Sequence, residues 1–178
     1  MTQTAWIGLG ANLGDARAAL AGAVQALARL PASRLAGVSP LYRSAPWQAD
    51  GPDYLNAVVR LQTDLAALAL LDALQAIESA AGRTRPYPNA PRTLDLDLLA
   101  HGDAVCATPR LTLPHPRLAE RAFVLRPWHD LDPQAAVPGL GTVAALLPGV
   151  AGQDAAVLEA GAWWQPGPCR DTPAATSS

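Results

Sequence analysis

The segment that most constrains the fold of this chain is a strictly alternating run at residues 94–98, which reads LDLDL. Alternation with a period of two is typical of a half-buried β-strand, in which the leucines face a core and both carboxylates face the other way. The Cα atoms of Asp95 and Asp97 would then lie about 6.6 Å apart, so the two side chains can converge on a divalent ion. Arg92, shortly before Asp95, adds a guanidinium fork suited to phosphate. This combination indicates Mg²⁺ and a polyphosphate.

A strand with one solvated face would give the same alternation, and for the two aspartates alone that is the better interpretation. Bare carboxylates at this spacing repel each other by about 2.5 kcal/mol at an effective dielectric constant of roughly 20. That repulsion is tolerable in open water, but it persists in a cleft unless a cation lies between the two groups. Arg92 beside the pair makes a nucleotide–metal site the preferred interpretation.

The bulk composition is that of one globular domain, because half of the 178 residues are apolar. The longest uninterrupted apolar run, residues 65–71, is too short to cross a bilayer. The N-terminus lacks the basic and apolar regions of a secretory signal. Cys106 and Cys169 are far apart in the sequence and fit a reducing compartment. We therefore expect a cytoplasmic protein.

The chain contains no lysine, and all 13 of its basic side chains are arginine. A Walker A lysine, a Schiff-base lysine and a lysine general base are thereby excluded. A GC-rich coding bias would produce the same composition, but the exclusion holds either way. Residues 83–126 contain seven arginines and four acidic residues. Such a basic zone suits a small polyanion better than a long nucleic acid, although a scattered solvated surface would carry the same charge.

Hydrophobic periodicity predicts four strands and two helices. The strands lie near residues 4–10, 34–43, 54–63 and 94–99, and the helices near 16–30 and 64–81. The order βαββαβ indicates an α+β, ferredoxin-like fold, an antiparallel sheet with both helices on one face, followed by a C-terminal extension. Residues 1–165 are expected to form a single domain, with the tryptophan pair at 163–164 packing its end onto the body. Residues 166–178 are expected to form a flexible tail.

The alternation of the third strand places Tyr54 and Asn56 on the face away from the helices. Asp95 and Asp97 emerge on the same face, which the two helices leave uncovered. The two strands therefore predict one shared binding surface.

Several other side chains have both an ordinary and a functional interpretation. Tyr54 and Phe123 could be plain strand or core aromatics, or two flat faces that sandwich a planar heterocycle whose edge bonds the Asn56 amide. Gln75 and Glu78 lie on the second helix, where they could face solvent or could reach a ribose.

His115 lies between two prolines that fix its backbone. A lone histidine is usually structural. This one is close in the sequence to Arg110, Thr112, Arg117 and Arg121, and such a group can donate hydrogen bonds to phosphate oxygens.

Five motifs occur in order along most of the chain, within residues 4 to 148. They are GANLG at 10–14, PDYLNA at 52–57, PRTLDLDLL at 91–99, LPHPR at 113–117 and RAF at 121–123. Together they resemble the 6-hydroxymethyl-7,8-dihydropterin pyrophosphokinase family of folate biosynthesis. The resemblance implies a ferredoxin-like fold with an added C-terminal part. It also implies an enzyme that moves the pyrophosphoryl group of ATP to the hydroxymethyl oxygen of the pterin and releases AMP.

The resemblance implies roles for individual residues. Asp95 and Asp97 would hold two Mg²⁺ ions, and Arg83 and Arg92 would close on the phosphates, which makes these four the catalytic residues. The pterin-binding positions would be Ser44, Ala45, Trp47, Tyr54, Asn56 and Phe123. The ATP-binding positions would be Gln75, Glu78, Arg85, Arg92, Leu98, Arg110, Thr112, His115 and Arg121. The expected partners are ATP and the pterin, without a nucleic acid or a membrane, and the chain is expected to act as a monomer.

Two other classes of protein compete with this interpretation. Nucleotidyltransferases also carry two carboxylates at alternate positions of a strand, but their glycine-serine turn comes shortly before the acids. Here the glycine turn at residues 10–14 lies far upstream, which disfavours that class. A ferredoxin-like regulatory or RNA-binding module would not need paired carboxylates, and RNA binding favours aromatic and basic residues on the open sheet face.

Overall fold

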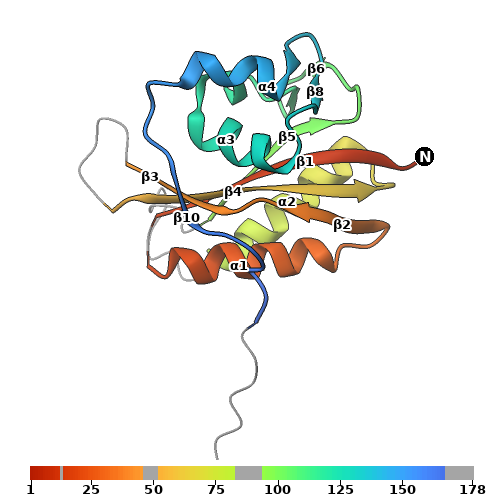
Figure 1. Ribbon diagram of the computed structural model, residues 1–178. Coiled ribbons are helices and arrows are strands. Elements are labelled where there is room, and N and C mark those ends of the chain that lie inside the picture. The colour runs from red at the N-terminus through yellow and green to blue at the C-terminus, as the bar shows by residue number, and fades with distance from the viewer. Residues whose placement is uncertain (13, 46–51, 83–93, 167–178) are drawn as a thin grey trace, which may run out of the picture.

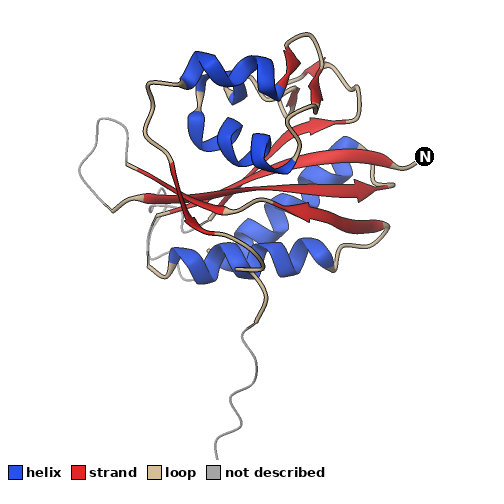
Figure 2. Ribbon diagram, viewed as in Figure 1, coloured by secondary structure: helices blue, strands red, loops and turns tan. Residues whose placement is uncertain are grey.

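An antiparallel sheet separates two helical layers in the computed structural model, which describes residues 1–12, 14–45, 52–82 and 94–166 (Figures 1 and 2). The sheet and the lower layer are formed by β1 (Gln3–Ala11), α1 (Ala16–Ala28), β2 (Ser33–Val38), β3 (Leu41–Ser44), β4 (Tyr54–Thr63), α2 (Ala67–Ala81) and β5 (Asp95–His101). The upper layer and the end of the chain contain β6 (Cys106–Ala107), β7 (Thr112–Leu113), η1 (Leu118–Glu120), α3 (Ala122–Leu131), β8 (Ala136–Val137), β9 (Gly141–Thr142), α4 (Val143–Leu146), η2 (Leu147–Val150) and β10 (Ala156–Glu159).

The main sheet has the strand order β10-β3-β4-β1-β5, and β2 pairs with β4 beside β3. All of these pairings are antiparallel, so the predicted ferredoxin-like α+β fold is confirmed. The strand predicted near residues 34–43 is divided into β2 and β3. Pro40 has no N–H for the ladder, and the hydroxyl of Ser39 accepts the backbone N–H of Val58 at 2.9 Å in place of a ladder carbonyl.

Both predicted helices form and cover the lower face of the sheet (Figure 1). The side chain of Asp15 accepts the Ala18 N–H at 3.0 Å, which caps α1 as Asp residues commonly do. The buried stripe of this helix includes Leu20, Val24 and Leu27. In α2 the fully buried residues are Leu70 and Leu74, and the helix ends at Gly82.

The leucines of the alternating segment face this helical layer. Leu94, Leu96 and Leu98 belong to the same buried cluster as the helix stripes, whereas Asp95 is exposed and Asp97 is partly exposed. Both carboxylates therefore lie on the upper face, as predicted.

The upper face is only partly open, which the sequence interpretation did not anticipate. Helix α3 lies over one end of it, where Trp128 is buried and its ring centroid is 5.3 Å from that of Trp6. Leu99 belongs to this second buried cluster because it follows the alternation of Asp95 and Asp97, and Ala100 joins it where the β1–β5 register shifts between Trp6 and Ile7. The predicted binding surface is thus confined to the other end, near Asp95.

The segment after α4 runs from the upper layer across the sheet edge to the lower layer (Figure 1). Its strand β10 pairs with β3. Trp163 is buried in the lower core, and its indole N–H donates to the Ser39 carbonyl at 2.9 Å. Arg17 donates to both carboxylate oxygens of Glu159 at 2.7 Å. The expectation that the tryptophan pair packs this end of the chain is confirmed.

None of the helices in the described part of the chain is long and apolar enough to cross a membrane.

Replacing Trp163 by Ala should lower the free energy of unfolding by about 3–5 kcal/mol, because a buried indole is lost and a cavity remains. The half-buried neighbour Trp164 is the matched control, and Trp164→Ala should cost clearly less. Urea unfolding followed by circular dichroism measures both. Equal losses in the two variants would contradict this role of Trp163.

Candidate active site

The floor of the candidate site is a row of residues across three neighbouring strands. Gly10 of β1 lies opposite Asn56 of β4 on one side and opposite Asp95 of β5 on the other. Two residues away on the same face of β1, Gly8 lies opposite Asp97. Asn56 and Asp95 are thus separated by two strand spacings, about 10 Å, with no side chain between them. The two glycines leave a flat surface between the amide and the carboxylates.

Gly10 is required by close approach. A Cβ atom at this position would lie 3.2 Å from the side-chain oxygen of Asn56. The sequence interpretation placed Gly10 at the start of a turn, but β1 continues to Ala11, and Gly10 belongs to the strand.

The amide of Asn56 is held in a fixed orientation. It is buried and donates from Nδ2 to the Ser44 hydroxyl at 3.0 Å. Ala45 follows Ser44 and is exposed, and Tyr54 begins β4 with 38% of its surface exposed. Four of the predicted pterin-binding residues are therefore contributed by the adjoining strands β3 and β4 and the residue after β3.

Phe123 and Arg121 form a stacked pair at the start of α3. The guanidinium carbon of Arg121 lies 5.5 Å from the centroid of the Phe123 ring, within the range of a cation–π contact. Both side chains are half-buried.

His115 lies beside the carboxylates, with its Nε2 4.0 Å from Oδ1 of Asp97. Its Nδ1 accepts the backbone N–H of Arg117 at 3.2 Å, so in the neutral ring the proton is on Nε2 and points toward the carboxylate side. Burial lowers the pKa of His115, and the charges of Arg121 and Arg117 lower it further against the opposing attraction of Asp97.

A hollow of about 270 Å³ adjoins Asp97 of β5. Its lining includes Asp97 and four of the predicted ATP-binding residues, Leu98, Arg110, Thr112 and His115. Arg110 also pairs with Asp72 of α2 and lies 3.5 Å from the Gln75 side-chain oxygen. Glu78 follows one turn later on α2. The structure thus brings the predicted nucleotide residues of α2 and of the segment around β7 together.

Four predicted residues lie outside the described part of the chain. They are Trp47, Arg83, Arg85 and Arg92.

The family model of 7,8-dihydro-6-hydroxymethylpterin-pyrophosphokinase (HPPK) matches residues 6–133. The chain belongs to this family. Its activity is that of an ATP-dependent pyrophosphokinase in folate biosynthesis, and the nucleotidyltransferase and RNA-binding alternatives are set aside.

Curated relatives and solved structures agree with HPPK membership. A 2-amino-4-hydroxy-6-hydroxymethyldihydropteridine pyrophosphokinase of Pseudomonas aeruginosa is 48% identical over 139 residues, which cover 78% of this chain and 86% of the relative. The enzyme of the same name from Haemophilus influenzae is 38% identical over 145 residues, 81% of this chain and 91% of the relative. The crystal structure of wild-type Plasmodium falciparum HPPK-DHPS with SDX-DHP has a similar fold, with a TM-score of 0.68 at 14% identity, covering 83% of this chain and 44% of that one.

The HPPK carboxylate pair suits a magnesium ion that is shared with a substrate. In the described part of the chain, no three His, Cys, Asp or Glu side chains are grouped so as to hold a metal. Mg²⁺ binds through one or two carboxylates and completes its octahedron with water and substrate phosphates. Asp95 and Asp97, accessible beside a hollow lined by Arg110 and His115, fit this requirement.

Sequence reasoning missed two features of this HPPK site. The alternation of Gly8 and Gly10 with large residues is visible in the sequence, and it could have indicated a cleared strand face. The pairing of Asp72 with Arg110 joins residues 38 positions apart and leaves no local signal.

In the metal-free protein, the pKa of His115 should lie below the ordinary value of 6.5. Asp97→Asn should lower it further, because the Asp97 carboxylate favours the imidazolium. Proton NMR titration of the three histidines, assigned with His115→Gln, measures both values. A pKa above 6.5 in the wild-type protein would contradict the described surroundings of the ring.

Proposed function

We propose that Asp95 and Asp97 together hold two Mg²⁺ ions while the enzyme transfers pyrophosphate from ATP to the hydroxymethyl group of 6-hydroxymethyl-7,8-dihydropterin. The observation that carries this proposal is the position of the two carboxylates. They lie between a side-chain-free floor that leads to Asn56 and a hollow lined by Arg110 and His115. A planar acceptor on one side and a triphosphate on the other would meet at these two residues.

The floor over Gly10 is the proposed pterin site. A pterin is flat and carries donors and acceptors along its edge, so it needs stacking surfaces and an amide of fixed orientation. Asn56, held by Ser44, supplies the amide, and the backbone of Ala45 lies at the same edge. Tyr54 and Phe123 supply aromatic faces, and Trp47 belongs to the same set of residues.

The hollow beside β5 is the proposed ATP site. Arg110, Thr112 and His115 would bind phosphate oxygens or the nucleoside, while Leu98 forms part of the wall. Gln75 and Glu78 of α2 lie where a ribose would reach the helix. Arg121 and the arginines at 83, 85 and 92 complete the set of phosphate-binding groups, which is free of lysine throughout.

The reaction is an in-line displacement at the β-phosphorus. The pterin hydroxyl oxygen forms a bond to that phosphorus and loses its proton, and the bond from the β-phosphorus to the bridging oxygen breaks, so that AMP departs with that oxygen. Mg²⁺ held by Asp95 and Asp97 would supply charge neutralisation at the phosphates. The protein's own contribution is positioning and electrostatic stabilisation, because no covalent intermediate is required. Neutral His115 donates a hydrogen bond to ATP without adding charge. The guanidinium groups of Arg83 and Arg92 offset the negative charge that spreads from the phosphorus.

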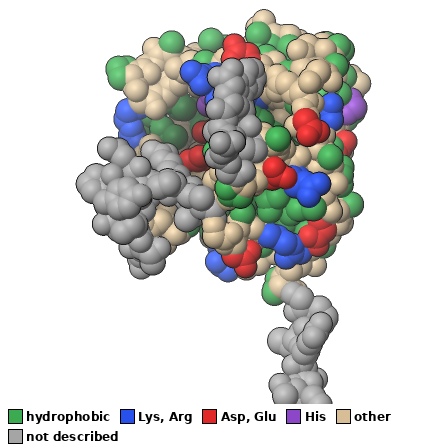
Figure 3. All heavy atoms as spheres, turned by 90° about the vertical axis from the view of Figure 1, so that its left-hand side faces the viewer, with side chains coloured by type: hydrophobic (Ala, Val, Ile, Leu, Met, Phe, Trp, Pro, Cys, Tyr) green, Lys and Arg blue, Asp and Glu red, His purple; other side chains and the backbone are tan. Residues whose placement is uncertain are grey.

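The proposed working unit is residues 1–165 as one catalytic domain, acting as a cytoplasmic monomer on small molecules, and residues 167–178 of the predicted tail lie outside the described part of the chain. Basic and acidic side chains are interspersed on the face of the molecule in Figure 3, which supports a small-molecule partner over a long nucleic acid.

Asp97→Asn should lower turnover by more than about a hundredfold, the effect of losing one major electrostatic group in an active site. Affinity for the pterin should be largely kept, because Asn56 and the floor are unchanged. Asp103→Asn, at an exposed carboxylate outside the site, is the control and should behave as wild type. The assay incubates ATP, Mg²⁺ and the pterin, and then quantifies nucleotides by chromatography. ADP as the product, or lost pterin affinity with normal turnover at saturation, would contradict the assignment.

Gly10→Val should weaken pterin binding at least about tenfold, because the valine side chain would occupy the floor of the proposed pterin site and displace the Asn56 amide. Gly22→Val, on the solvated part of α1 where an added Cβ meets nothing within 4 Å, controls for the β-branched residue itself. Calorimetric titration with the pterin measures affinity for both. Unchanged affinity in Gly10→Val would place the pterin elsewhere.

A further inference from the structure

The side-chain amide of Gln153 bonds the backbone on both sides of Arg121. Its Nε2 donates to the carbonyl of Glu120 at 2.7 Å, and its Oε1 accepts the N–H of Ala122 at 2.9 Å. These two backbone groups flank Arg121, so the amide pairs with the chain there much as a neighbouring strand would. Gln153 lies outside residues 6–133, which the family model covers.

The backbone around Arg121 that Gln153 contacts receives little stabilisation from residues close to it in the sequence. Arg121 is the extended residue between η1 and α3, with φ −125° and ψ 113°, and its own side chain does not cap the helix that follows it. The N–H of Ala122 is the first of α3, and a helix offers no internal partner to such a group. Gln153 supplies that partner from 31 residues away. The amide therefore fixes the conformation from which both Arg121 and Phe123 extend.

Gln153 is itself firmly placed. Its backbone N–H donates to the Val150 carbonyl at 3.0 Å, and its carbonyl accepts from Arg126 of α3 at 3.4 Å. Arg126 also donates to the Ala155 carbonyl. The segment that carries Gln153 is thus tied to η1 and α3 by four hydrogen bonds, two through the amide and two through Arg126.

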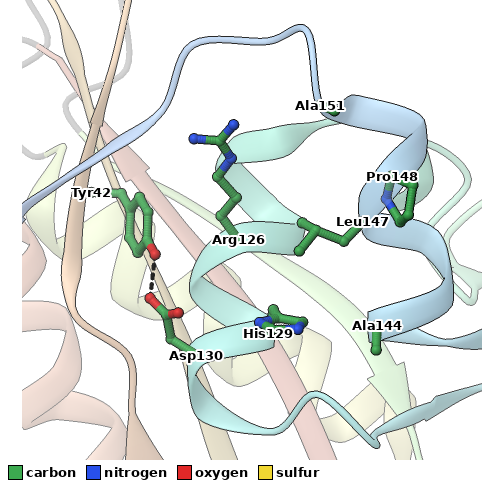
Figure 4. Close-up of a pocket in the computed structure, with 8 residues that line it drawn as sticks. All are labelled: Tyr42, Arg126, His129, Asp130, Ala144, Leu147, Pro148 and Ala151. Carbon is green, nitrogen blue, oxygen red and sulfur yellow. Dashed lines mark hydrogen bonds between the residues drawn. The ribbon is translucent and has the colours of Figure 1, made fainter.

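The opposite end of α3 is anchored separately. The hydroxyl of Tyr42 on β3 donates to the carboxylate of Asp130, as Figure 4 shows beside the hollow between β3, α3 and η2. Burial and this carboxylate raise the pKa of Tyr42 well above its usual range, so the phenol remains a donor at neutral pH. With its far end held to the sheet, α3 keeps one orientation, and the amide of Gln153 sets the conformation at its start.

We propose that Gln153 is a positioning residue that holds Arg121 and Phe123 in the arrangement needed for ATP and the pterin. The inference rests on the proposed roles of those two residues. An amide is required because the site needs one donor and one acceptor on the same side chain. A glutamate at this position keeps the acceptor for Ala122 but brings a negative charge against the Glu120 carbonyl, and alanine provides neither group.

The test compares steady-state kinetics of Gln153→Ala, Gln153→Glu and the control Gln134→Ala, whose side chain is exposed. Gln153→Ala should raise the KM of both substrates about tenfold, an effect within the range of coupling between contacting residues, with a smaller change in kcat. Gln153→Glu should not restore the wild-type KM, and Gln134→Ala should leave it unchanged. Hydrogen exchange at the Ala122 N–H should accelerate in Gln153→Ala.

A double variant separates positioning from general stability. In an Arg121→Ala background, Gln153→Ala should change the KM for ATP much less than it does in wild type, because the positioned group is already absent. Equal effects in both backgrounds, or a lower Tm with unchanged KM values, would overturn the proposal. A wild-type protein that forms no AMP from ATP and the pterin would instead overturn the proposed function, so the two failures are distinguishable.

Discussion

The burial of three leucines beneath the sheet is the constraint on which the site depends. Placing Leu94, Leu96 and Leu98 in the core contributes about 1.5–3 kcal/mol for each side chain. The repulsion between the two carboxylates on the other face is about 2.5 kcal/mol, so leucine burial decides the orientation of the strand. A shift of the strand register by one residue would turn both aspartates toward the helical layer, so the observed register is strongly favoured. The fold and the face that is proposed to bind metal are therefore specified by the same five residues.

The neighbouring strands and the C-terminal segment form the rest of the site. Gly8 and Gly10 clear the neighbouring strand, and Asn56 closes the far side of the floor. The C-terminal segment then links the two faces. Gln153 of this segment bonds the backbone around Arg121 at the start of α3, and the chain continues through β10 to bury Trp163 in the opposite core. Residues beyond the matched family region thus support residues within it.

Local patterns in the sequence were enough to predict the βαββαβ order, the helix stripes and the sidedness of Asp95 and Asp97, because each depends on periodicity along one element. Helix α3 was missed because Pro127 lies within it and interrupts a helical pattern. The division of the second strand follows from Pro40, whose effect becomes clear only when its partner strand is known. Contacts such as Gln153 with Glu120 join distant segments through an ordinary residue type, and a single sequence carries no signal for them.

The most direct test of the account counts the metal ions that the carboxylate pair holds. Equilibrium dialysis with Mn²⁺ in place of Mg²⁺, a non-hydrolysable ATP analogue and the pterin would give the number bound per chain in the ternary complex. We expect two bound ions for the wild-type protein and loss of tight binding in the Asp95→Asn/Asp97→Asn double variant. The same count and affinity in the double variant would show that these residues do not hold the metal, and would contradict the central claim.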